Sequence, residues 1–277
     1  MENRKSILIT GCSSGIGAFC ARALKKDGWR VFATARKPED IAALRSLDIE
    51  TFYLDYREPE SIKALVADIL KATGGTLDAL FNNGGYAQPG AVEDLPMEAL
   101  REQFEANFFG WHDLTRRIVP VMRKQGHGRI VFCSSIFGHL PQKLRGAYIA
   151  SKHALEGLMV SMRMELWQSG IEVSLIVPGP IESKVAINAA AYADKYIDVQ
   201  NSPHRASYEK RLALLRAGGV KDKTKLGPDA VYAELKRALE SPRPRAHYYV
   251  TRPAKLGMLL RRVLPSQMLY NLLARSS

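Results

Sequence analysis

The fold is decided by the stretch Ser6-Ile7-Leu8-Ile9-Thr10-Gly11-Cys12-Ser13-Ser14-Gly15-Ile16-Gly17. It opens with a short apolar run, Ile7–Thr10, which is typical of a buried strand. A glycine-rich turn follows, and beyond Gly15 apolar residues recur with helical spacing until Gly28. The stretch therefore predicts a strand, a tight turn and a helix, which is the unit from which layered α/β domains are built.

The same alternation continues along most of the 277 residues. Further strands are expected at 31–35, 51–54, 77–81, 129–133, 172–177 and 247–250, and helices at 58–72, 96–125 and 147–168. Alternating strands and helices imply a parallel sheet with right-handed crossovers. We therefore predict a single α/β domain over residues 1–253, with a doubly wound, Rossmann-type sheet covered by helices on both faces.

Two segments depart from this alternation. Residues 182–226 are irregular, with one helix expected near Ser207–Arg216, and we interpret them as a substrate-loop insertion over the carboxyl edge of the sheet. Residues 254–277 form a basic amphipathic tail, in which Pro265 should separate two short helices.

The glycine-rich turn suits a bound pyrophosphate, because glycines let the backbone approach closely and the helix N-terminus offers free N–H groups. The spacing Gly-x3-Gly-x-Gly differs from the common dinucleotide fingerprint. Gly11-Cys12-Ser13-Ser14-Gly15 also matches the nucleophile elbow of α/β-hydrolases, with Ser13 as nucleophile and His139 or His247 as base. That alternative is weak, because no earlier strand supplies the second oxyanion donor.

Tyr148 and Lys152 stand four residues apart, on one face of an expected helix. Ser135 lies at the end of the preceding strand, thirteen residues before Tyr148, and Asn107 lies in the long helix before that. Asn82-Asn83-Gly84-Gly85 closes the fourth strand, and Pro178-Gly179-Pro180-Ile181 follows the sixth. Taken together in this order, the motifs are specific enough to identify a protein family.

In residues 6–184 this order of motifs resembles the short-chain dehydrogenase/reductase family, and within it the branch of retinol dehydrogenases, 17β-hydroxysteroid dehydrogenases and bacterial NADP-dependent aldehyde reductases. The resemblance implies an oxidoreductase that interconverts a carbonyl and an alcohol on a small apolar substrate. Tyr148 would be the acid or base, with a pKa lowered by Lys152, and Ser135 would bind the substrate oxygen. Asn107 would bend its helix and order a water beside Lys152.

We expect the cofactor to be NADP(H), because the second strand ends in Ala35-Arg36-Lys37 without the acid that holds an NAD ribose. An arginine suits a 2′-phosphate. The expected cofactor-binding residues are Gly11, Ser13, Ser14, Gly15, Ile16, Gly17, Arg36, Lys37, Asp55, Asn83, Gly84, Tyr148, Lys152, Pro178, Gly179 and Ile181. A sensor that binds NADP(H) without turnover is an alternative, disfavoured by the intact set of catalytic residues.

Of the net charge of +12, residues 203–277 carry +11, from 16 basic and 5 acidic side chains. We find no nucleic-acid motif and expect no such partner. In the tail, the apolar face either packs on the cleft or a neighbouring subunit, or contacts an anionic membrane peripherally. The resemblance implies a homodimer or homotetramer built on the helices at 96–125 and 147–168.

The remaining expectations concern location and metal. The three cysteines have no metal or redox spacing, and no apolar run suits a signal peptide or a membrane span, so we expect a cytoplasmic protein. We expect no metal site, because the histidines lack ligand spacing and are interpreted as packing or surface residues: His112, His127, His139 and His153.

Overall fold

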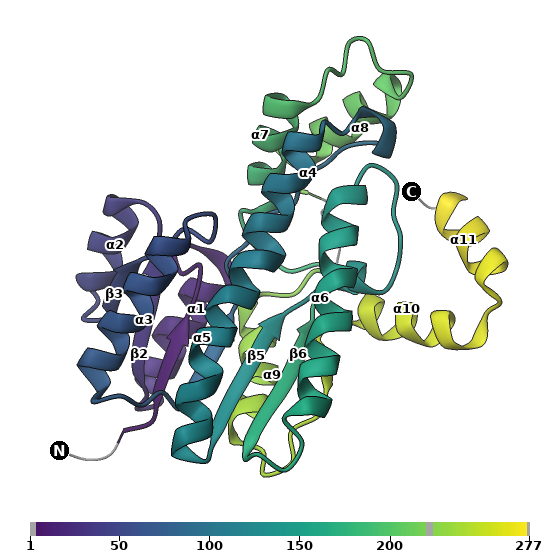
Figure 1. Ribbon diagram of the computed structural model, residues 1–277. Helices are drawn as coiled ribbons and strands as arrows, with labels where there is room; N and C mark the ends of the chain where they lie inside the picture. Colours follow the sequence, from purple (N-terminus) through teal and green to yellow (C-terminus); the bar gives the residue numbers. More distant parts are fainter. Residues whose placement is uncertain (1–3, 220–223, 276–277) are drawn as a thin grey trace.

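Seven parallel strands form one sheet in the computed structural model, which describes residues 4–219 and 224–275 (Figure 1). The strands are β1 (Ser6–Ile9), β2 (Arg30–Ala35), β3 (Glu50–Tyr53), β4 (Ala79–Asn82), β5 (Gly128–Cys133), β6 (Ile171–Val177) and β7 (His247–Tyr249). Their order is β3-β2-β1-β4-β5-β6-β7, so the chain starts in the middle and winds outward in both directions. The predicted doubly wound α/β fold is confirmed.

Helices cover both faces of this sheet. On one face α3 (Pro59–Thr73), α5 (Gly110–Gln125) and α6 (Gly146–Glu165) lie side by side, and on the other α1 (Gly15–Lys26) packs against α9 (Pro228–Glu240) (Figure 1). A short helix, α2 (Pro38–Arg45), lies beside the edge strands. The central strands β1 and β4 are buried throughout, whereas the edge strand β3 exposes Glu50 and Tyr53, as burial on both faces of a parallel sheet predicts.

The long helix expected at 96–125 is interrupted. It consists of α4 (Met97–Phe104), a π-helical segment (Glu105–Phe109) and α5. A π-helical turn inserts one extra residue and often marks a functional position. The segment contains Asn107, so the expected bend at this residue has a structural basis.

The segment 182–226 contains two helices, α7 (Val185–Tyr196) and α8 (Arg205–Arg216), which project with α4 beyond the carboxyl edge of the sheet (Figure 1). The helix predicted near Ser207–Arg216 is α8. The prediction missed α7, because its buried face consists of the small residues Ala189, Ala190 and Ala193, which give little hydrophobic periodicity.

The tail forms α10 (Arg252–Val263) and α11 (Ser266–Arg275), which break at Pro265 as predicted. The first of these starts just before the boundary expected at residue 253. Gly257 brings α10 against the body of the protein, because a Cβ there would lie 2.7 Å from Leu140 Cδ1. The pair then extends away from the sheet (Figure 1). Within the described residues, no helix has the length and apolarity required to span a bilayer.

Candidate active site

The glycine-rich turn lies at the carboxyl end of β1 and is packed tightly against the end of β4. Gly11 has φ +69°, and a Cβ on it would lie 2.4 Å from Gly84 Cα. A Cβ on Gly17 would lie 2.3 Å from the carbonyl oxygen of Gly11. Only glycine fits these positions, so the backbone of the turn is held close to the end of β4 at the N-terminus of α1, where we expected a pyrophosphate to bind.

Polar contacts join this turn to the end of β4. The Asn83 side-chain amide donates to the carbonyl oxygen of Thr10 at 3.0 Å, and Thr10 Oγ1 accepts from the backbone N–H of Asn83 at 2.8 Å and of Gly84 at 3.1 Å. Asn83 therefore holds the glycine-rich turn in place from the side. Ser13 is exposed and Ser14 is partly exposed, so both side chains remain accessible to a ligand. The hydrolase alternative fails here, because no histidine of the described residues hydrogen-bonds to Ser13.

Ser135, Tyr148 and Lys152 come together at the carboxyl end of β5. Ser135 lies two residues beyond the end of β5 and caps a short 3₁₀ turn (Ile136–Gly138), where its hydroxyl accepts from the N–H of Phe137 at 3.2 Å. Tyr148 and Lys152 lie one turn apart on α6. The Ser135 hydroxyl lies near enough to the phenol of Tyr148 to favour its ionised form. The three residues that the sequence placed in order thus meet in one site.

The acid–base properties of Tyr148 differ from the expectation. Burial raises the pKa of its phenol to about 12, while the hydrogen bond with Ser135 and the charge of Arg145 act in the opposite direction. Lys152 is not the cation that acts on the phenol here. Its ammonium donates to the carbonyl oxygen of Cys133 at 2.8 Å and lies 4.2 Å from the ring centre of Trp111. The pKa of Tyr148 is thus raised in this structure although the Lys152 ammonium lies 5.8 Å from the centre of its ring, and the lowering expected from Lys152 stays a prediction.

Lys152 is itself perturbed. Burial lowers the pKa of its ammonium to about 8, partly offset by Cys133 and by the negative charge of Glu156. Because this pKa is close to neutral pH, the buried amine of Lys152 still carries a proton at neutral pH and can exchange it.

Asn107 is completely buried in the π-helical segment, and its side chain is fully used. Its Oδ1 accepts from the N–H of Tyr86 at 3.1 Å, and its Nδ2 donates to the carbonyl oxygen of Tyr86 at 2.8 Å. Gly85, the last residue of the Asn82-Asn83-Gly84-Gly85 motif, was not among the expected cofactor-binding residues, and a Cβ on it would lie 2.8 Å from Asn107 Oδ1. Asn107 thus fixes the loop after β4 beside the site.

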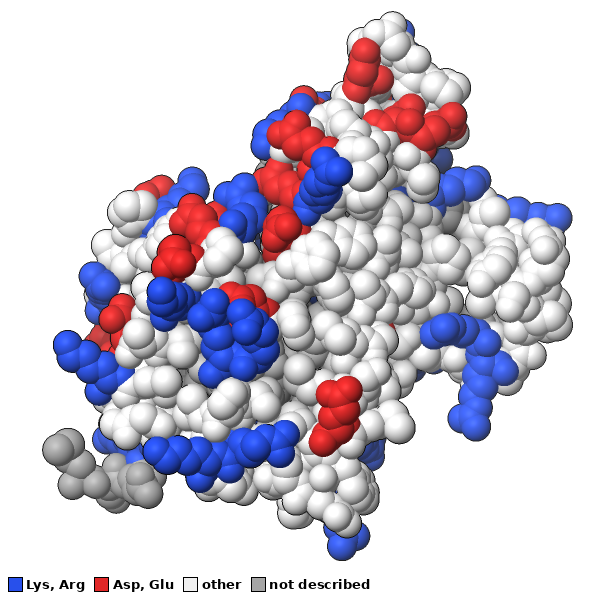
Figure 2. Space-filling model, viewed as in Figure 1, with Lys and Arg blue, Asp and Glu red and all other residues white. Residues whose placement is uncertain are grey.

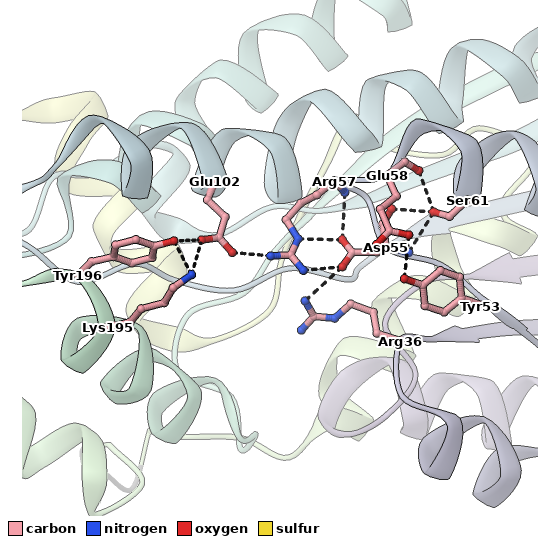
Figure 3. Close-up of polar contacts among 9 residues, drawn as sticks. All are labelled: Arg36, Tyr53, Asp55, Arg57, Glu58, Ser61, Glu102, Lys195 and Tyr196. Atoms are coloured by element: carbon pink, nitrogen blue, oxygen red, sulfur yellow. Dashed lines mark hydrogen bonds and ion pairs between the residues drawn. The ribbon is translucent and has the colours of Figure 1, made fainter.

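At the end of β2 and β3 the side chains form a charged network (Figure 3). Asp55 accepts from Arg57 at 2.6 and 3.0 Å, and Arg36 approaches it to 3.8 Å with its side chain still half exposed. Burial opposes ionisation of Asp55, but the Arg57 contacts outweigh it and hold the pKa of the carboxyl below its ordinary value. Lys37 next to Arg36 is exposed. The strand end thus presents two cations and no free acid.

The same network reaches the substrate loop. Arg57 also donates to Glu102 of α4 at 2.6 Å, and Glu102 is bonded in turn to Lys195 at 3.3 Å and to the Tyr196 hydroxyl (Figure 3). The C-terminal end of α7 is therefore tied to α4 beside the cofactor edge. Sequence periodicity did not reveal this link, because the three elements are distant in the chain.

The motif after β6 lies against the other elements of the site. The carbonyl oxygen of Pro178 accepts from the N–H of Ile136 at 2.9 Å, and Gly179 faces Thr251 so closely that a Cβ would lie 2.2 Å from its Oγ1. Ile181 pairs as an isolated bridge with Leu226 and closes the base of the loop.

The model of the short chain dehydrogenase family matches residues 5–193. The chain belongs to the short-chain dehydrogenase/reductase family. An uncharacterized oxidoreductase of Escherichia coli K12, YbbO, is 38% identical to this dehydrogenase over 271 residues, which are 98% of this chain and 94% of that relative. An NADPH-dependent 3-dehydrocapnine reductase of Ornithobacterium rhinotracheale is 32% identical over 258 residues, with 90% and 88% covered.

Solved structures of similar proteins have the same fold. A short-chain dehydrogenase from Streptomyces avermitilis superposes with a TM-score of 0.78 at 30% identity and covers 93% of this chain and 92% of its own. A variant of actinorhodin polyketide ketoreductase, solved with NADPH, superposes with a TM-score of 0.73 at 28% identity, over 90% and 97%.

One cluster in this dehydrogenase was not anticipated from the sequence. His139, Glu156 and His247 bring their ligand atoms within 4.8 Å of one another, although they come from the 3₁₀ turn, α6 and β7. Glu156 accepts from His247 at 2.8 Å and from the hydroxyl of Ser134, and lies 3.3 Å from His139 Nε2. Such a set is of the kind that holds a metal ion, so the interpretation of His139 as a packing or surface residue was incomplete.

The chemistry around this cluster indicates an ion-pair network. The guanidinium of Arg261 donates to His139 Nδ1 at 3.0 Å, while His139 Nε2, on the other side of the ring, lies 3.3 Å from Glu156. Burial opposes ionisation of Glu156, but the two histidines and Ser134 outweigh it and lower its pKa to about 2. The cluster thereby links α10 to the catalytic helix α6.

Proposed function

We propose that this dehydrogenase interconverts a carbonyl and an alcohol group on a small, largely apolar substrate, uses NADP(H), and has Tyr148 as its acid–base group. The observation that carries the proposal is the meeting of Ser135, Tyr148 and Lys152 at the carboxyl end of β5, beside the glycine cradle at the end of β1. In open α/β sheets this edge is where ligands bind.

The residues divide the work as follows. NADPH, when bound, supplies a hydride to the carbonyl carbon. Ser135 donates a hydrogen bond to the substrate oxygen as negative charge develops on it. Tyr148 gives that oxygen its proton, and a phenol with a pKa of about 12 is protonated at neutral pH and so is suited to act as the acid in reduction. Lys152 holds the ribose hydroxyls and restores the proton, and Asn107 keeps the loop after β4 in position.

Tyr148→Phe tests the acid. We expect NADPH binding to persist and turnover of an aldehyde panel to fall about 10²- to 10⁴-fold, because proton transfer by a positioned group contributes that much. Tyr232→Phe is the matched control: Tyr232 and Lys236 have the same spacing, but Tyr232 bonds to Asp27 on the far face of the sheet. If Tyr148→Phe keeps more than about half of the activity, the assignment of the acid fails.

The NADP(H) preference rests on the exposed guanidinium of Arg36, with Lys37 beside it and no acid at the end of β2. It is supported by an NADPH-dependent relative and by a ketoreductase solved with NADPH. Arg36→Asp should reverse or abolish the preference for NADPH over NADH, whereas Arg123→Asp, the same charge change at the end of α5, should not. Equal kcat/KM with both cofactors in the unmodified protein would refute the preference.

We further propose that the dehydrogenase is a homodimer or homotetramer. Exposed apolar side chains occur along the helices α4–α6: Met97, Phe109, Met164 and Trp167. Figure 2 shows a broad surface without charged side chains between α4 and the tail helices. The tail itself exposes Leu256, Leu259, Val263, Met268 and Leu272 among basic residues, so its partner is either a second subunit or an anionic membrane surface.

A further inference from the structure

Two arginines without an acidic partner among the described residues meet at the segment that precedes α6: Arg145 belongs to it, and Arg211 contacts Gln142 within it. Arg145 is the residue at the N-terminal boundary of α6, three positions before Tyr148, and its guanidinium carbon lies 4.7 Å from the ring centre of Phe137. The same Phe137 ring packs edge-on against Tyr148, with 6.4 Å between ring centres. Arg211 comes from α8 in the substrate loop and donates to Gln142 Oε1 at 3.2 Å. The two guanidinium groups are close enough for the charge of Arg211 to disfavour the charge of Arg145.

The absence of an acid distinguishes these two arginines from their neighbours. Two other arginines of α8 are paired: Arg205 with Glu209 at 2.9 Å, and Arg216 with Asp194 at 2.7 Å. In residues 4–219 and 224–275, neither Arg145 nor Arg211 forms a salt bridge. Both are only partly exposed.

The pKa values of both guanidinium groups are lowered, as expected for cations that lack an acidic partner and are partly shielded from water. Burial and the charge of Arg211 lower the pKa of the Arg145 guanidinium to about 10, and burial lowers the pKa of Arg211. Taking a cation out of water is costly unless an anion accompanies it. A site that maintains two such cations next to its acid is therefore arranged for a ligand that brings negative charge.

The surroundings of the two arginines are apolar. Leu144 and Tyr148 pack against a cluster formed by α7, α8 and the loop after β4, which includes Ala189, Leu212 and Leu215. The members of this cluster are buried, so the apolar contact open to a hydrocarbon body is the partly exposed edge formed by Leu144 and Tyr148, and the arginines supply a polar end. Planar guanidinium groups bind carboxylate, sulfonate and phosphate oxygens through paired N–H contacts.

We propose that the carbonyl substrate of this dehydrogenase is an amphiphile that carries an oxyanion group, bound by Arg145 and Arg211 while Tyr148 acts on the carbonyl oxygen. The proposal rests on the proposed function for the place of the carbonyl. It refines the expected apolar substrate to one with an apolar body and an anionic end.

Matched pairs of carbonyl compounds test it. The probes are 3-oxooctanoate against its methyl ester, and 4-formylbenzoate against its methyl ester, with NADPH oxidation as the readout. We expect kcat/KM to favour the free acid by about tenfold to a hundredfold in at least one pair, as one or two charged hydrogen bonds would produce. Arg145→Gln and Arg211→Gln should each remove that preference, judged by the ratio of the acid rate to the ester rate in the same variant. Arg216→Gln on α8 is the control and should keep it, and Arg145→Lys should keep part of it.

A binding measurement separates this proposal from the proposed function. Calorimetric titration of 3-oxooctanoate and its ester, with NADP⁺ present, is made on the unmodified, Arg145→Gln and Tyr148→Phe proteins. Tighter binding of the acid that Arg145→Gln removes and Tyr148→Phe retains supports the anion site, whatever the turnover. If the ester binds and reacts as well as the acid, or if Arg145→Gln and Arg211→Gln weaken both equally, the anion site is overturned. Turnover that survives Tyr148→Phe would refute only the catalytic assignment.

Discussion

Replacing Glu156 by Gln removes the one negative charge in the cluster that joins α6 to the 3₁₀ turn and β7. The carboxylate lies between His139 and His247 and its side chain is 9% exposed. Glutamine keeps the size of the side chain and can accept a hydrogen bond, but it cannot titrate. The substitution therefore isolates the contribution of the charge to stability.

The magnitude follows from the pKa of Glu156, which is about 2 in the folded protein against an ordinary 4.5. A pKa lowered by folding means that the folded state favours the ionised carboxylate, so the stabilisation is complete well above 4.5 and is lost as the pH falls toward 2. The shift corresponds to roughly 3 kcal/mol at neutral pH. About 2 kcal/mol of it should disappear between about pH 5 and about pH 3.

Urea unfolding at a series of pH values measures this difference. We expect the free energy of unfolding of the unmodified protein to fall about 2 kcal/mol more than that of Glu156→Gln between about pH 5 and about pH 3. Glu165→Gln is the control, because Glu165 is exposed at the end of the same helix and has no ion pair within the described residues. It should follow the unmodified protein throughout.

The reasoning is refuted if Glu156→Gln and the unmodified protein lose stability in parallel over this range. It is also refuted if stability in the unmodified protein rises as the pH falls, because that sign would require a raised pKa. Added chelator should change neither curve if the cluster is an ion-pair network alone.

Two further predictions concern the cofactor cradle and the tail. Gly11→Ala should weaken NADPH binding by about tenfold or more, because the added Cβ lies 2.4 Å from Gly84 Cα and the backbone at Gly11 is left-handed. Fluorescence titration measures the binding. The control is Gly28→Ala, where φ is +90° but no atom lies within 4 Å of the added Cβ, and this variant should bind NADPH normally. If the tail binds membranes, the protein should cosediment with anionic vesicles at low salt, less so at high salt, and not with neutral vesicles. Deletion of residues 254–277 should abolish this cosedimentation. If cosedimentation is absent, or is unchanged by the deletion, the tail is an interface within or between subunits.

The features that the sequence determined by itself are those that depend on neighbouring residues in the chain. Gly11 and Gly17 are required by backbone geometry, and the Tyr148–Lys152 pair follows from helical spacing, so both could be recognised without coordinates. The order of strands and helices was readable for the same reason, since period-2 and period-3.6 patterns are local. The small alanines of α7 show the limit, because a helix whose buried face has little hydrophobic contrast leaves a weak pattern.

Tertiary structure alone decided which distant side chains meet. His139, Glu156 and His247 come from three elements and form one cluster only after β7 is added to the sheet edge. Arg211 of α8 acts on the charge of Arg145 and contacts Gln142 just before α6, although these residues are far from Arg211 in the chain. The pKa of Tyr148 likewise depends on burial and on where the Lys152 ammonium points. Spacing along the chain carries no information on such contacts, because burial and Coulomb interactions depend on distance in space.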